Sequence, residues 1–144
     1  MNTPEIEQAQ TEIIDQFDGL DEWLDRYAVI IDMGNELEPL PDNLKTPSRR
    51  IEGCQSNVWI DSSLNADGTV TFRADSDALI VKGIIAMLLH VLSGRRPADI
   101  LDADLHFIGD LGIDTHLSPT RSNGLLAMLK NIKATAAAYA GGAK

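Results

Sequence analysis

The chain has 144 residues, of which 44% are hydrophobic and 24% charged, a composition typical of one globular domain over residues 1–144. The formal net charge of -10 argues against a nucleic-acid partner, because phosphate contacts require clustered Lys and Arg side chains. The single cysteine, Cys54, excludes an internal disulfide and a multi-cysteine metal site within one chain.

Two helices and an extended connector are predicted for the first third of the chain. Thr3 followed by Pro4 is a helix-start signal, and the apolar residues that follow recur at helical spacing. Gly19 interrupts that pattern, and a second helix from residue 20 should fade near Gly34. The acidic N-terminus lacks the basic start and apolar run of a signal peptide, so a cytoplasmic protein is expected.

A small antiparallel sheet is predicted next. Alternating apolar and polar residues at 58–62 and 70–72 flank Asp67 and Gly68, a strong turn signal, so these two runs should form a hairpin. Residues 49–52 are expected to add a third strand. Cys54 would then lie in a loop at the rim of this sheet.

Helices are predicted again for the second half. Asp75, Ser76 and Asp77 are candidates to cap a helix over residues 78–92, which is apolar on nearly every side and should form the centre of the core. That apolar stretch is too short to span a bilayer, so no membrane association is expected. Pro97 should open a short helix, and Ser118 a last long one. The stripe of the last helix expected to be buried comprises Leu125, Leu126, Met128, Leu129, Ile132 and Tyr139. The fold class is therefore α+β, with a sheet of about three strands covered by helices.

The surroundings of Cys54 bear on its role. Cysteine is often buried as a small hydrophobic residue, and that reading is open here. However, its neighbours Gly53, Gln55, Ser56 and Asn57 are typical of a loop, in which glycine allows unusual backbone conformations and the polar side chains can bond local amides. This setting favours a thiol presented at the tip of a loop.

Histidine placement argues against two other kinds of site. A cysteine hydrolase needs a histidine base beside Cys54, and only His116 lies in a suitable loop, while His90 reads as a core or interface residue and His106 lies in an amphipathic stretch. The histidines also lack the spacing of a metal-ligand set. No metal is therefore expected.

Arg121 occupies the first turn of the last predicted helix, where the helix dipole favours acidic residues. This placement predicts an acidic partner for Arg121, either within the fold or on another protein.

Three motifs taken together resemble the SufE/CsdE family of sulfur-acceptor proteins: "EGCQSNVWI", "DSDALIVKGIIAMLL" and "THLSPTRSNGL". The resemblance implies a fold similar to that of the iron–sulfur scaffold (IscU-like) proteins. It also implies a protein that takes persulfide sulfur from a cysteine desulfurase, stimulates that enzyme, and relays sulfur to iron–sulfur cluster assembly. This chain would then have no cofactor of its own: pyridoxal phosphate would belong to the desulfurase partner, of the SufS or CsdA type, and a scaffold protein would lie downstream.

The resemblance assigns roles by position. Cys54 carries the persulfide intermediate, and we expect it to be poorly exposed in the isolated protein. The residues implied in shaping its loop or docking the partner are Gly53, Gln55, Ser56, Asp77, His116 and Arg121. The protein would be a sulfur-transfer accessory rather than a stand-alone enzyme. The alternative is a binding module that activates the desulfurase allosterically, and the sequence leaves open whether the free protein is a monomer or a homodimer.

Overall fold

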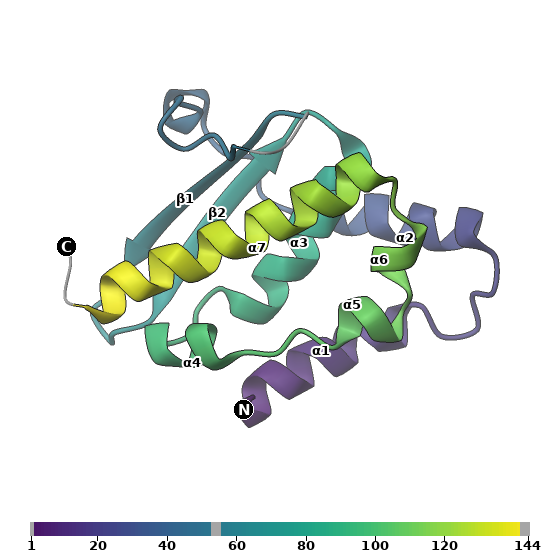
Figure 1. Ribbon diagram of the computed structural model, residues 1–144, viewed down its shortest axis with the longest axis horizontal. Helices are drawn as coiled ribbons and strands as arrows, with labels where there is room; N and C mark the ends of the chain where they lie inside the picture. The colour runs from purple at the N-terminus through teal and green to yellow at the C-terminus, as the bar shows by residue number, and fades with distance from the viewer. Residues whose placement is uncertain (1, 53–55, 142–144) are drawn as a thin grey trace.

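The structure, a computed structural model, describes residues 2–52 and 56–141 (Figure 1). Its strands are β1 (Val58–Leu64) and β2 (Val70–Ser76). The helices are α1 (Pro4–Gln16), α2 (Trp23–Glu36), α3 (Leu79–Leu92), α4 (Pro97–Asp102), α5 (Phe107–Asp110), α6 (Ile113–His116) and α7 (Pro119–Ala140), with a 3-10 turn, η1 (Asp42–Leu44), between α2 and β1. The α+β class predicted from the sequence is confirmed.

The two N-terminal helices differ in how well they were predicted. The start of α1 is confirmed, because the Thr3 side chain accepts a hydrogen bond from the amide of Ile6 at 3.2 Å. The second helix begins at Trp23, three residues after its predicted start, and ends at Glu36, close to the predicted end near Gly34. Gly34 also marks a helix crossing: a Cβ at this position would lie 2.7 Å from the backbone nitrogen of Gly83 in α3.

The hairpin is confirmed. β1 and β2 pair antiparallel, with Val58 opposite Ser76 and Leu64 opposite Val70. The turn has Gly68 at φ +89, a left-handed conformation that favours glycine.

The third strand is wrong, because among the described residues the sheet has two strands. The segment before Cys54 forms one isolated bridge, Arg50 to Trp59. The amides of Arg49 and Arg50 both turn back to the carbonyl of Thr46, at 3.0 and 3.2 Å, so this segment begins as a turn and cannot form a longer ladder.

The predicted cap of the central helix is also wrong. Asp75 and Ser76 belong to β2, and α3 begins at Leu79 with Ala78 in the N-cap position and no side-chain cap. The Asp75 carboxylate instead accepts hydrogen bonds from the amides of Leu40 and Ser76. Local propensity for a helix start was overridden by these tertiary contacts.

The core is built around α3, whose inward-facing side chains include several that are completely buried, such as Ile85 and Leu88. The helix packs against α1, α2, α7 and β2, and Figure 1 shows α7 running along the hairpin in front of it. Most of the predicted α7 stripe is buried or half-buried, but Leu126 is 63% exposed, which contradicts that prediction. No helix of residues 2–52 and 56–141 is long and apolar enough to cross a membrane.

Candidate functional site

The chain segments on either side of Cys54 are held together by backbone hydrogen bonds. The amide of Ile51 donates to the carbonyl of Val58 at 2.8 Å, and the amide of Ile60 donates to the carbonyl of Arg49 at 3.0 Å. These two bonds bring the entering and leaving segments together at one end of β1. Gly53, Cys54 and Gln55 lie outside the described residues. The low exposure predicted for the Cys54 thiol therefore stays a prediction.

Asn57 ties the leaving segment to the start of α3. Its amide and its side-chain nitrogen donate to the two carboxylate oxygens of Asp77, at 3.1 and 2.8 Å. Its carbonyl accepts from the Ser76 hydroxyl at 2.8 Å, and its side-chain oxygen accepts from Arg50 Nε at 2.9 Å. We call Arg50, Asn57, Ser76 and Asp77 the Asn57 junction. It links both sides of the Cys54 segment to the turn between β2 and α3.

A narrow pocket of about 20 Å³ opens beside the Asn57 junction, room for roughly one water-sized atom. It lies between α3 and the first turns of α7, and it joins two residues that the sequence singled out, Ser56 and Arg121. The residues lining this pocket are Ser56, Val81, Ile84, Thr120, Arg121, Gly124 and Met128. The lining combines apolar side chains of α3 and α7 with the polar residues Ser56 and Thr120 and the basic residue Arg121, a mixture compatible with a small, polarisable anion.

Arg121 is exposed and forms no ion pair with a carboxylate of the described residues. Its backbone amide is bound by the Ser118 side chain at 3.2 Å, the N-cap of α7. The predicted cap is therefore confirmed. An acidic partner for Arg121 on another protein stays a prediction.

His116 lies apart from this pocket. Its ring stacks on Trp23 with centroids 3.9 Å apart, and its Nδ1 is 3.0 Å from the carbonyl oxygen of Gly112. The hydroxyl of Tyr27 donates to the His116 carbonyl at 3.0 Å. His116 thus joins α6 to α2, and the structure does not place it with Ser56 and Arg121.

Asp75 is a buried carboxylate next to the Asn57 junction, with a side chain only 7% exposed. It accepts from the amides of Leu40 at 3.1 Å and Ser76 at 2.8 Å, and the ammonium groups of Lys45 and Lys82 lie 3.4 and 3.3 Å away. Burial by itself would raise the pKa of Asp75, but the two amide bonds and Lys82 outweigh burial and lower the pKa below its ordinary value. This anion fastens the connector before Cys54 to β2 and α3.

His106 bridges α1 and α5. Its Nδ1 lies 2.6 Å from Asp110 and its Nε2 lies 3.0 Å from Glu7. Carboxylates only accept hydrogen bonds and a neutral imidazole has one N–H, so both bonds form together only on the imidazolium. The bond to Asp110, and then that to Glu7, raises the pKa of His106 despite partial burial.

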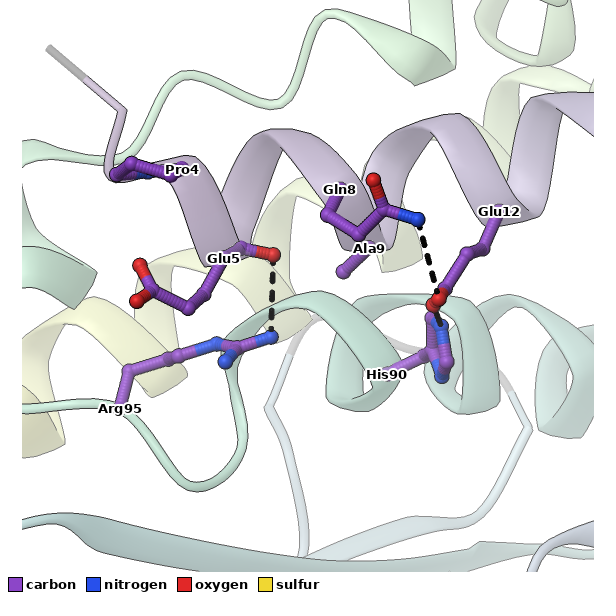
Figure 2. A pocket seen from close by; sticks show the side chains of 7 residues that line it. All are labelled: Pro4, Glu5, Gln8, Ala9, Glu12, His90 and Arg95. Atoms are coloured by element: carbon purple, nitrogen blue, oxygen red, sulfur yellow. Dashed lines mark hydrogen bonds and ion pairs between the residues drawn. The ribbon is translucent and has the colours of Figure 1, made fainter.

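His90 is exposed, so of its two predicted roles the core role is wrong, and the interface role stays a prediction. It bonds Glu12 of α1 at 2.8 Å, at the edge of an open surface hollow of about 470 Å³ (Figure 2). That hollow is lined by Pro4, Glu5, Gln8, Ala9, Glu12, His90 and Arg95, none of which belongs to the Cys54 segment. The described residues include no group of three potential metal ligands.

Sequence reasoning missed the most connected members of this site. The loop composition suggested that Ser56 or Asn57 bonds nearby amides, but Asn57 bonds Asp77, twenty residues away. No local sequence signal indicates the hydrogen bond that Arg50 donates to Asn57. Asp75 was explained as a cap. No local signal distinguishes these roles, because each partner is supplied by a different element of the fold.

The comparisons with known proteins agree with this picture of the fold. A family model described as "SufE: Fe-S metabolism associated domain" matches residues 11–136. An uncharacterized SufE-like protein of Rhizobium meliloti (strain 1021) is 40% identical over 129 residues, which are 87% of this chain and 92% of that relative. The solution structure of a hypothetical protein from Thermus thermophilus matches with a TM-score of 0.72 and 24% identity, covering 95% of this chain and 96% of the other.

The solved structure shares the fold, a helical domain around a small sheet. The family model covers well over half of the chain and so defines its class, a domain associated with Fe–S metabolism. The chain belongs to the SufE family.

Proposed function

We propose that this protein is a sulfur acceptor that takes the outer sulfur of a cysteine desulfurase persulfide onto Cys54, stimulates the desulfurase, and passes the sulfur to iron–sulfur cluster assembly. The observation that carries the proposal is the position of Cys54 in the sequence. It lies within the part of the chain that the family model matches, and the segments before and after it are hydrogen-bonded to each other; Ser56, in the following segment, lines a pocket together with Arg121. A cysteine that only packed in the core would not need such a setting.

The transfer step needs no external oxidant or reductant. The Cys54 thiolate attacks the outer sulfur atom of the desulfurase persulfide, and a new S–S bond forms on Cys54. The S–S bond on the desulfurase breaks, and the desulfurase cysteine leaves as its thiolate. One sulfur atom, with its proton, has then moved from the partner to Cys54.

The surrounding residues have separate parts in this proposal. Asp77, through Asn57, holds the segment that follows Cys54, and Arg121 attracts the anionic sulfur at the pocket rim. Gly53, Gln55 and Ser56 shape the thiol loop. The desulfurase supplies pyridoxal phosphate, the downstream acceptor is an iron–sulfur scaffold, and the cytoplasm keeps the lone thiol reduced. The likeness to scaffold folds implied by the motifs stays a prediction.

Intact mass spectrometry tests the proposal. The protein is mixed with a cysteine desulfurase and cysteine, and the expected result is an added sulfur atom that dithiothreitol removes. The matched control is Cys54→Ser, which should gain no sulfur. Absence of the adduct on the wild-type protein, with a desulfurase that is active on cysteine, would refute the proposal.

The same variant decides between sulfur transfer and the alternative, a binding module that activates the desulfurase allosterically. A sulfur acceptor loses its stimulation of sulfide release in Cys54→Ser, whereas a binding module keeps it.

A further inference from the structure

The first turns of α2 present an apolar side chain to solvent. Leu24 is 81% exposed, more than any other large hydrophobic residue of the described part of the chain. A single exposed leucine is ordinary on a protein surface. Leu24, however, follows Trp23 directly and lies close in sequence to Tyr27, both half-buried. Figure 1 places this end of α2 beside α6, at the edge of the molecule.

The aromatic residues next to Leu24 are held rigidly. Trp23 stacks on His116 at 3.9 Å and contacts the Tyr27 ring at 5.6 Å. The Arg26 guanidinium lies 5.2 Å from the Trp23 ring centre and donates to the carbonyls of Leu20 and Leu111, at 2.7 and 2.9 Å. We call Trp23, Arg26, Tyr27 and His116 the Trp23 platform. Trp, Tyr and Arg dominate binding energy at interfaces, and a rigid platform loses little entropy on binding.

Acidic residues lie close to the platform residues in the sequence and indicate the charge of its partner. Asp21, Glu22, Asp25 and Asp114 are all exposed, and none forms an ion pair with another described residue. Residues 1–42 carry twelve Asp and Glu and a single basic residue, Arg26, whereas the rest of the chain carries ten acids and eleven bases.

This distribution selects one kind of occupant. An apolar centre with an acidic rim fits a protein surface that has an apolar pocket rimmed by Lys and Arg. A second copy of this chain fits poorly, because a symmetric contact would set the same acidic rims against each other.

The platform lies within reach of the candidate site. Arg121 follows His116 by five positions in the chain, so even a fully extended segment would put them at most about 18 Å apart. A standard interface covers about 800 Å² on each partner, roughly 30 Å across. A protein that docks over the pocket of Ser56 and Arg121 therefore has room to cover the Trp23 platform as well.

We propose that Leu24 and the Trp23 platform form a docking surface for the cysteine desulfurase, which would carry a complementary apolar pocket with a basic rim. This inference rests on the proposed function, since it names where the sulfur donor binds. The surface anchors the partner and takes no part in the chemistry at Cys54.

The test compares Leu24→Lys with Leu64→Lys, using isothermal titration calorimetry with a pyridoxal-phosphate cysteine desulfurase. Leu64 is 42% exposed and lies at the far end of β1 from Cys54, so it is a matched control for charge and for loss of a leucine. Leu24→Lys should weaken binding at least tenfold, and Leu64→Lys less than twofold. At saturating concentration, Leu24→Lys should stimulate the desulfurase as much as the wild type, because Cys54 is intact.

A second variant tests the acidic rim. Glu22→Lys with Asp25→Lys should weaken binding several-fold at low salt and reduce its salt dependence. Equal affinities for wild type, Leu24→Lys and the rim variant would overturn the docking surface while leaving the proposed function intact. A wild-type self-association that Leu24→Lys abolishes, with unchanged desulfurase affinity, would assign the surface to a second copy instead. Failure of the wild type to bind any active desulfurase would overturn both proposals.

Discussion

The buried carboxylate of Asp75 makes a quantitative test of what holds the candidate site together. Asp75→Ala removes the acceptor of two backbone amides, those of Leu40 and Ser76, and the counter-charge of Lys45 and Lys82. Each amide bond to a charged acceptor contributes about 1.5–3 kcal/mol, and Lys45 and Lys82, with side chains 27% and 19% exposed, lose their counter-charge in a partly buried site. The expected loss in free energy of unfolding is about 3–5 kcal/mol, the range for breaking a buried ion pair.

Urea unfolding followed by circular dichroism measures this loss. The matched control is Asp61→Ala, which removes a carboxylate that bonds Arg49 at 2.9 Å at a more exposed position and should cost about 1 kcal/mol or less. Because the pKa of Asp75 is lowered in the folded state, its contribution is complete above the unfolded value of about 3.9 and is lost as the pH falls through the lowered folded value. A loss no larger than that of Asp61→Ala at pH 7 would refute the reasoning.

Three further outcomes follow from particular contacts. Because the pKa of His106 is raised, its imidazolium stabilises the fold fully below about pH 6.5, and this stability is lost as the pH rises through the folded pKa. The difference in urea stability between wild type and His106→Asn should therefore shrink from pH 6 to pH 9, and a constant difference would contradict this. Gly83→Ala places a Cβ against the carbonyl oxygen of Ile30, so α2 and α3 must move apart. The expected loss of stability is about 3 kcal/mol or more, and a melting temperature equal to that of the wild type would contradict it. Asn57→Ala breaks the two side-chain hydrogen bonds that Asn57 makes to Arg50 and Asp77, at a cost of about 1 kcal/mol. Iodoacetamide should then alkylate Cys54 about fivefold faster. An unchanged rate would show that the Asn57 junction does not restrain the Cys54 segment.

The structure explains why the motif around Cys54 was readable before the fold was known. A lone cysteine between glycine and polar residues is recognisable from neighbours in the sequence. The partners that hold its flanks are not, because Asp77 and Asp75 each present a plausible helix-cap reading. Only their hydrogen bonds to Asn57 and to the distant Leu40 amide decide between a cap and a junction.

The spacing of apolar residues also did not predict which side chains of α7 are exposed to solvent. Leu125 and Leu126 are equally apolar neighbours in the sequence, yet Leu125 is buried and Leu126 is exposed. Which of them faces the core depends on where α7 lies against α3 and α4, which the period of one helix does not specify.

The sequence by itself determined the helix starts at Thr3 and Ser118, the hairpin turn at Gly68 and the family to which the chain belongs. These features depend on hydrogen bonds within a few residues or on contiguous motifs, so local chemistry is sufficient to specify them. The tertiary structure alone decided which groups meet across the chain: Asn57 with Asp77, the Leu40 amide with the buried carboxylate of β2, and Trp23 with His116. The physical reason is distance along the chain, because such partners are selected by how helices and strands pack together rather than by the residues beside them.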